Sequence, residues 1–171
     1  VLADEVQTAL DGLSKGQSQV LFLHMMGSHG PAYHLRIPKD QKKWLPECTA
    51  NDLGSCSEKE LGNAYDNSVR YTNKVLAGII DTLKGVSGMN TAMLYVSDYG
   101  ESLGEKGLYL HGALYWMSPD EQVQVPMVMW MSENFAQDYK VDREKLAATA
   151  KSKVTHESLY HTVLGLLQVS I

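Results

Sequence analysis

The chain has 171 residues, a hydrophobic content of 44% and a formal net charge of −5 at pH 7. This length suits one ordinary domain with a buried core, and the composition excludes disordered and fibrous classes. The acidic balance provides no basic surface for nucleic acid and no polybasic patch for a membrane surface. We therefore expect no nucleic-acid partner.

No apolar run approaches the roughly 20 residues that a helix needs to cross a bilayer. The longest runs, at residues 20–23 and 127–131, have the length of strands. No charged-then-apolar signal segment opens the sequence. We expect that any segment responsible for export or membrane attachment lies outside these 171 residues.

The first part of the chain predicts a helix, a strand and a long loop. Apolar residues at helical spacing predict an amphipathic helix over residues 1–13. Residues 19–24 form a continuous apolar run, which is typical of a strand buried on both faces. Residues 31–57 contain several prolines and no sustained periodicity, and a loop of that length in a compact domain is usually functional.

The second part alternates helices and strands. Ser57 and Glu60 form a capping box that starts the clearest helix, which ends near Gly85 and Gly88. Strands are predicted at residues 91–97 and 125–131, with a glycine-rich stretch at 100–112 between them. Helices follow at 142–153 and 156–167, the last capped by Thr155. This alternation predicts an α/β fold with a mostly parallel sheet sandwiched by helices, in one domain or part of one.

The two cysteines, Cys48 and Cys56, lie in a polar loop rich in turn-forming residues. Their even number and short spacing fit a local disulfide, which would imply an oxidising compartment. Two unrelated reduced thiols fit equally well. Metal binding by this pair is disfavoured, because the spacing exceeds that of the usual zinc pairs.

Polar side chains follow two of the predicted strands, where the strands enter glycine-rich loops. Ligands bind beyond the carboxyl ends of parallel strands, so we expect these side chains to converge. Histidines, carboxylates and a phenol at one edge suit a divalent metal that prefers nitrogen and oxygen ligands. The candidates are His24, His29, Asp98, Tyr99, Glu101 and His111.

Each candidate also has a structural interpretation. His24 ends an apolar strand, where a histidine is more often part of the core or of the shell behind a site. His29 could be an ordinary loop residue, and Asp98 could cap a turn. Glu101 and Glu105 could be solvated loop charges.

Several segments, in this order, resemble lipid A phosphoethanolamine transferases, the group that includes the mobile colistin-resistance enzymes of the alkaline phosphatase and sulfatase superfamily. The combination of Gly-Ser-His-Gly-Pro with Ser-Asp-x-Gly-Glu-Ser-Leu-Gly-Glu is the specific part of the resemblance. The segments are His24-Met-Met-Gly-Ser-His-Gly-Pro-Ala-Tyr33, Tyr65-Asp-Asn-Ser68, Val96-Ser-Asp-Tyr-Gly-Glu-Ser-Leu-Gly-Glu105, Tyr109-Leu-His-Gly112, Gln124-Val-Pro-Met127 and His161-Thr-Val-Leu-Gly165.

The resemblance implies an alkaline phosphatase-like α/β fold, of which residues 1–171 would be the C-terminal part of the catalytic domain. Members of the group have an N-terminal membrane domain and a disulfide-rich periplasmic domain. The resemblance therefore implies a Cys48–Cys56 disulfide and a location at the periplasmic face of the inner membrane, with an anchor outside this sequence.

The resemblance also implies roles for individual residues. Asp98 matches an aspartate that binds the catalytic zinc, and Tyr99 stands where the family has a zinc-binding histidine. His29 and His111 match histidines that hold the phosphoethanolamine group or a second zinc. Glu101 matches an acidic residue that assists metal or donor-amine binding.

The implied reaction uses Zn2+ to activate a threonine that lies outside this chain. Phosphoethanolamine passes from phosphatidylethanolamine to the threonine and then to lipid A, which gives polymyxin resistance. Without the threonine, the fragment by itself is expected to be inactive. The alternatives are a degenerate domain that binds headgroups without chemistry and a sulfatase-type or phosphatase-type hydrolase.

Overall fold

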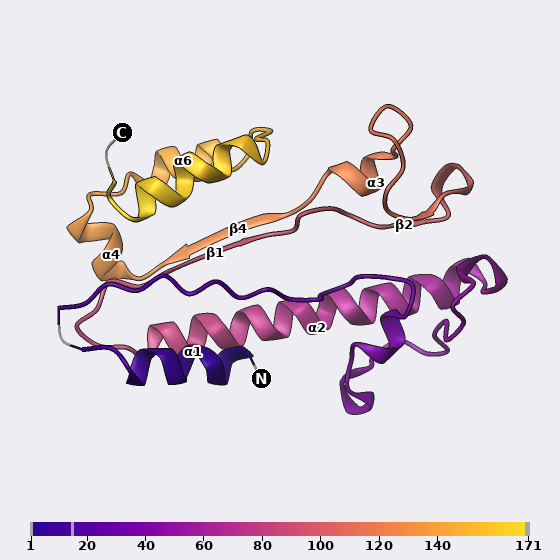
Figure 1. Cartoon of the computed structure of the whole chain (residues 1–171), viewed down its shortest axis with the longest axis horizontal. Helices are drawn as coiled ribbons and strands as arrows, with labels where there is room; N and C mark the ends of the chain where they lie inside the picture. Colours follow the sequence, from indigo (N-terminus) through magenta and orange to yellow (C-terminus); the bar gives the residue numbers. More distant parts are fainter. Residues whose placement is uncertain (1, 15, 170–171) are drawn as a thin grey trace. The chain divides into compact units, whose positions relative to one another are not determined.

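A computed structural model describes residues 2–14 and 16–169 of the chain (Figure 1). Two compact units emerge from its contacts. Unit 1 comprises residues Val1–Thr82 and Tyr95–Val128, and unit 2 comprises Leu83–Leu94 and Met129–Ile171. Among the described residues, no helix combines the length and the apolar content that a membrane crossing requires. All the site residues predicted above belong to unit 1.

Two helices run side by side in unit 1 (Figure 1). The first, α1 (Leu2–Asp11), buries Val6, and a methyl group placed at Gly78 of the long helix α2 (Glu58–Lys84) would meet Ala3 at 3.8 Å. The predicted capping box is confirmed at the start of α2. The Ser57 amide donates to the Glu60 carboxylate (3.0 Å), and the Glu60 amide donates to the Ser57 hydroxyl (3.3 Å).

The loop of residues 31–57 packs on α2 through a small core. It contains three short 3-10 helices, η1 (Tyr33–Leu35), η2 (Lys39–Gln41) and η3 (Leu53–Ser55). A disulfide joins Cys48 to Cys56, with the Cα atoms 5.8 Å apart, so this prediction is confirmed. The core cluster consists of Tyr33, Cys48, Leu53, Leu61 and Ala64.

The side chain of Asn67 in α2 forms hydrogen bonds with the backbone of the same loop. This side chain is fully buried, and its Oδ1 accepts hydrogen bonds from the amides of Lys43 (2.8 Å) and Trp44 (3.0 Å). Its Nδ2 donates to the Trp44 carbonyl (2.9 Å). A segment without regular hydrogen bonding thereby has its polar groups satisfied, which burial requires.

The strands form two pairs, β1 (Ala92–Val96) with β4 (Met127–Met131) and β2 (Ser102–Leu103) with β3 (Tyr109–Leu110). The β2–β3 pair is antiparallel. The β1–β4 pair is antiparallel too, because Ser97 donates to Pro126 at one end and Ser132 donates to Thr91 at the other. The parallel pairing that we expected is not formed between any two described strands.

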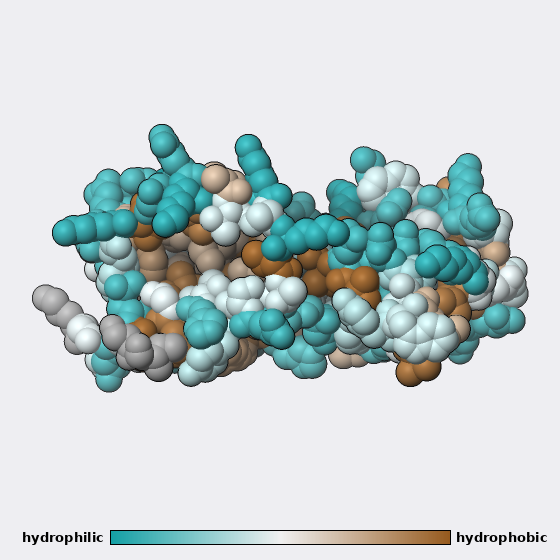
Figure 2. Space-filling model, turned by 90° about the horizontal axis from the view of Figure 1, so that it is seen from above, coloured by the Kyte–Doolittle hydropathy of each residue, from teal (hydrophilic) through white to brown (hydrophobic). Residues whose placement is uncertain are grey.

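Residues 19–24 do not form the strand that their sequence predicts. The segment lacks regular secondary structure, and Leu21 and Phe22 expose 44% and 83% of their surface. The physical reason is that a strand exists only as part of a ladder, and no strand of the described residues pairs with this segment. Apolar side chains of this segment therefore reach solvent. Figure 2 shows hydrophobic patches on one face of the molecule.

The remaining helices are short. Unit 1 contains α3 (Asp120–Val123), and unit 2 contains α4 (Glu133–Asp138), α5 (Arg143–Thr149) and α6 (Glu157–Leu166). We predicted α5 and α6 but not α3 and α4, which are too short for a periodic pattern. The predicted Thr155 cap of α6 is wrong. His156 occupies the cap position. The Thr155 hydroxyl donates to the Glu157 carboxylate (3.4 Å), and the Thr155 carbonyl accepts from the Ser158 amide (3.0 Å).

Candidate functional site

A buried carboxylate joins the two loops that the sequence singled out. The Glu101 side chain is only 4% exposed. Its Oε1 accepts from the Gly30 amide (3.0 Å) and lies 3.1 Å from His111 Nδ1, while its Oε2 accepts from the Tyr33 hydroxyl (3.3 Å). We call Glu101, Gly30, Tyr33 and His111 the Glu101 hub. A buried charge with several donors is well compensated, so the hub holds both loops in one arrangement.

Both site histidines use Nδ1 for structural contacts. His29 Nδ1 lies 2.6 Å from the Gly30 carbonyl, and His111 Nδ1 faces the Glu101 carboxylate. Each partner can only accept, so Nδ1 carries a proton in both rings and Nε2 is left for a ligand. The ring centroids are 5.0 Å apart with an interplanar angle of 84°. The two imidazoles are therefore close neighbours beside the Glu101 hub.

Tyr99 packs as a ring against these histidines. It stacks on His111, with the centroids 4.0 Å apart and the planes 27° apart, and meets His29 edge-on at 5.9 Å. Burial, followed by the negative charges of Asp98 and Glu101, raises the pKa of the phenol, and Arg36 opposes the shift. The phenol therefore keeps its proton near neutral pH, and a protonated phenol is a poor metal ligand.

Two residues that the sequence analysis did not select hold the histidine loop in place. The Arg36 guanidinium donates from Nε to the His29 carbonyl (2.5 Å). Burial and the neighbouring Glu101 charge raise the pKa of Tyr33, so its hydroxyl remains a donor to Glu101. Gly30 has no room for a side chain, because an added Cβ would lie 2.7 Å from the Tyr33 hydroxyl. The Gly-Pro-Ala-Tyr sequence was the available signal for Tyr33, whereas nothing in the sequence marked Arg36.

The donors present do not make a complete metal centre. Within residues 2–14 and 16–169, no group of three or more His, Cys, Asp or Glu side chains could hold a metal ion. Asp98 is exposed, and its negative charge helps to raise the pKa of Tyr99. His24 is also exposed, so it belongs to no core. The predicted pocket in which His29, Asp98 and His111 surround a cation is not closed by the described residues alone.

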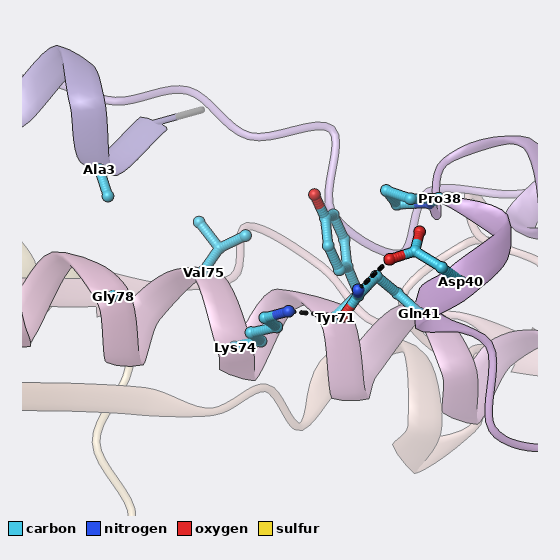
Figure 3. Close-up of a pocket in the computed structure, with 8 residues that line it drawn as sticks. All are labelled: Ala3, Pro38, Asp40, Gln41, Tyr71, Lys74, Val75 and Gly78. Atoms are coloured by element: carbon cyan, nitrogen blue, oxygen red, sulfur yellow. Dashed lines mark hydrogen bonds between the residues drawn. The ribbon is translucent and has the colours of Figure 1, made fainter.

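A separate groove of about 290 Å³ lies between α1, α2 and η2 in unit 1 (Figure 3). Its polar groups bond to each other, with Lys74 donating to Gln41 (2.6 Å) and Gln41 donating to Asp40 (2.6 Å). No histidine or buried carboxylate lines it, and none of the predicted site residues does. The lining residues are Ala3, Pro38, Asp40, Gln41, Tyr71, Lys74, Val75 and Gly78.

Comparison with known proteins places this chain in a family. The sequence matches the family described as sulfatase over residues 1–169. The chain belongs to the sulfatase family. Enzymes of this alkaline phosphatase-like family are metal-dependent.

The similar proteins are phosphoethanolamine transferases by name. The chain is 41% identical to phosphoethanolamine transferase EptA of Escherichia coli K12, over 88% of this chain and 28% of that protein. The soluble domain of lipooligosaccharide phosphoethanolamine transferase A from Neisseria meningitidis superposes with a TM-score of 0.90 at 37% identity. That match covers 97% of this chain and 49% of the domain. The C-terminal periplasmic domain of EptC from Campylobacter jejuni gives 0.87 at 34% identity, over 99% and 52%.

These superpositions confirm the predicted alkaline phosphatase-like α/β fold for a partial domain. The chain spans 28% of the length of the E. coli relative and about half of the two solved domains. The sulfatase match therefore spans nearly the whole chain, whereas the chain matches only a part of those longer proteins.

Proposed function

We propose that this chain is the C-terminal part of a phosphoethanolamine transferase domain, which acts at the periplasmic face of the inner membrane. The whole protein would move phosphoethanolamine from phosphatidylethanolamine to lipid A and so give polymyxin resistance. Similarity to transferases of this name supports the reaction class, and similarity to the periplasmic domain of the Campylobacter enzyme supports the location.

The paired imidazoles are the observation that carries this proposal. His29 and His111 lie 5.0 Å apart, with Nδ1 of each ring already engaged. When protonated, each ring keeps its Nδ1 partner and offers one Nε2–H to a phosphoryl oxygen. Two such donors suit a phosphate ester and offset charge on its oxygens. The buried Glu101 carboxylate contacts His111 directly and contacts the His29 loop through the Gly30 amide. Glu101 would act as the positioning residue for His111.

The metal in the proposal is zinc, bound chiefly by residues outside these 171. When bound, zinc would supply Lewis-acid stabilisation of charge on oxygen. Asp98 is the residue of this chain best suited to contribute a ligand, because its carboxylate is exposed in the loop after β1. Tyr99 would not be a ligand, because its ring stacks on His111.

Zinc calorimetry tests the role of Tyr99 in the intact, longer protein. We expect Tyr99→Phe to leave the dissociation constant for zinc unchanged, since only the phenol oxygen is lost. Tyr99→His should tighten zinc binding, because a neutral imidazole binds zinc near pH 7 without losing a proton. Weaker binding by Tyr99→Phe would show that the phenol ligates. Equal affinities of the wild type and Tyr99→His would count against the predicted gain.

The attacking group would be a threonine outside this chain, so the 171 residues alone should not catalyse transfer. The decisive measurement is mass spectrometry of lipid A from cells that carry the intact gene. We expect lipid A to gain phosphoethanolamine with the wild type and with the control His161→Ala, whose histidine is exposed on α6. The gain should be lost with His111→Ala.

Two other functions have specific support. Membership of the sulfatase family favours a hydrolase, and the Tyr99 ring in place of an imidazole favours a domain that binds headgroups without chemistry. A hydrolase would use water to release inorganic phosphate or sulfate and leave lipid A unmodified. A binding domain would retain phosphoethanolamine, seen as shifts of the His29 and His111 ring resonances, and release no product.

A further inference from the structure

An exposed hydrophobic turn follows directly after the His111 site. Residues 113–117, called here the aromatic tip, run Ala-Leu-Tyr-Trp-Met, and no charged residue occurs from 112 to 119. Leu114 is 63% exposed, Tyr115 85%, Trp116 78% and Met117 45%. Scattered exposed apolar residues are ordinary in soluble proteins, but four consecutive large ones form a patch that calls for an explanation.

The tip is a built turn with fixed ends. The Met117 and Ser118 amides donate to the Leu114 carbonyl (2.7 and 3.0 Å), and the Ser118 hydroxyl donates to the Ala113 carbonyl (3.0 Å). At its base, His111 contacts the buried Glu101 and Pro119 is fully buried. The backbone therefore holds these side chains outward, so their exposure is part of the fold and not the result of fraying.

The base of the tip is also bonded to the site loop. The Gly100 amide donates to the Gln122 carbonyl (3.0 Å), and the Gln122 side chain, 6% exposed, donates to the Ser102 hydroxyl (2.9 Å). Gly100 and Ser102 flank Glu101 in the sequence. Since Glu101 contacts His111, the same set of hydrogen bonds connects the tip to the paired imidazoles. A surface that the tip contacts therefore lies beside the site.

From these observations we infer that the aromatic tip inserts into the interfacial region of a lipid bilayer. Tyrosine and tryptophan prefer that region because each has an apolar ring and a polar group, and leucine and methionine can enter the acyl chains. The absence of charged side chains from 112 to 119 removes the main cost of insertion. The inference takes from the proposed function only that the donor is a phospholipid, whose headgroup lies at the depth that the tip would reach.

Flotation with vesicles tests the inference on the 171-residue chain. We expect binding both to phosphatidylcholine vesicles and to equal mixtures of phosphatidylcholine and phosphatidylethanolamine. Leu114→Ser with Trp116→Ser should lower the bound fraction about tenfold, because the apolar side chains that insert are lost. The control is Leu21→Ser with Phe22→Ser, which removes an exposed leucine and an exposed aromatic residue from residues 19–24 and should retain binding.

Three outcomes would overturn the inference: no vesicle binding by the wild type, equal loss in both double variants, or loss of self-association in the tip variant without any vesicle binding. The last outcome would assign the tip to a second copy of the chain. Unmodified lipid A in cells, with vesicle binding intact, would count against the proposed transferase alone. The two ideas therefore fail separately.

Tryptophan fluorescence provides a second measurement. In a variant with Trp44→Phe and Trp130→Phe, Trp116 is the remaining tryptophan, since the sequence contains three. Its emission should shift to shorter wavelength with phosphatidylcholine vesicles, and lipids brominated on the acyl chains should quench it. An unshifted, unquenched emission in the presence of bound protein would exclude insertion of the tip.

Discussion

The loop of residues 31–57 has prolines and no sustained periodicity, whereas residues 19–24 are the most regular apolar run in the first part of the chain. In the structure the irregular loop is the well-packed one. It has a disulfide, a buried core cluster and an asparagine that satisfies its amides. The regular run is left extended, with Phe22 83% exposed. In unit 1, the packing of these two segments depends on the tertiary contacts that each one makes and not on the regularity of its apolar sequence pattern.

The Glu101 hub should give the largest loss of stability, because removing its carboxylate leaves several buried partners unpaired. We expect Glu101→Ala to lower the free energy of unfolding by about 3 kcal/mol, at the upper end for buried groups left unsatisfied. Urea unfolding measures this loss. Glu101→Gln keeps an oxygen for the Gly30 amide and should lose about 1 kcal/mol. Equal stability of Glu101→Ala and the wild type would mean that the hub does not hold the loops together.

The disulfide should come next. Replacing both Cys48 and Cys56 by serine should lower the free energy of unfolding by about 2.5 kcal/mol in the chain-entropy view, given their separation of eight residues. Thermal unfolding with and without a reductant provides the control. The reductant should bring the wild type down to the level of the double variant and leave that variant unchanged. If complete reduction leaves the thermal unfolding of the wild type unchanged, the contacts of the loop other than the disulfide keep it ordered.

Alkaline pH should weaken the hub through Tyr33. Burial and Glu101 raise the pKa of Tyr33 above its ordinary 10.0, so the folded protein keeps a proton that the unfolded chain loses. Its contribution is full below pH 10 and is lost as pH rises further, by about 1 kcal/mol near pH 11. Between pH 9 and 11, the free energy of unfolding should fall less steeply with pH in Tyr33→Phe than in the wild type. Tyr160→Phe, at an exposed position, should leave the slope unchanged.

The smallest effect should come from residues 19–24. Phe22→Ser removes a side chain that the chain leaves in water, so we expect a change in unfolding free energy within about 0.5 kcal/mol. The measurement is urea unfolding of the 171-residue chain beside Glu101→Ala. A loss above about 1 kcal/mol would mean that Phe22 is buried in solution and would remove the contrast between the two segments.

Local signals predicted much of the fold. The capping box started α2 where expected, and the spacing of apolar residues predicted α1, β1 and β4. The site candidates came from their position after apolar runs and from the family resemblance. The structure brings together His29, Tyr99, Glu101 and His111, but it leaves Asp98 and His24 exposed. Sequence position alone cannot tell which candidates cluster and which stay exposed, because exposure depends on contacts with residues far away in the sequence.

By itself, the sequence determined the helices with strong caps and periodic faces, and the identity of the chemical groups at the site. These depend on neighbours within a few residues, which the sequence states directly. Only the tertiary structure decided that Glu101 is a buried hub, that Tyr99 stacks on His111, and that residues 19–24 have no strand partner. Each of these depends on which distant groups meet, and there a carboxylate or a phenol takes its role from the partners that surround it.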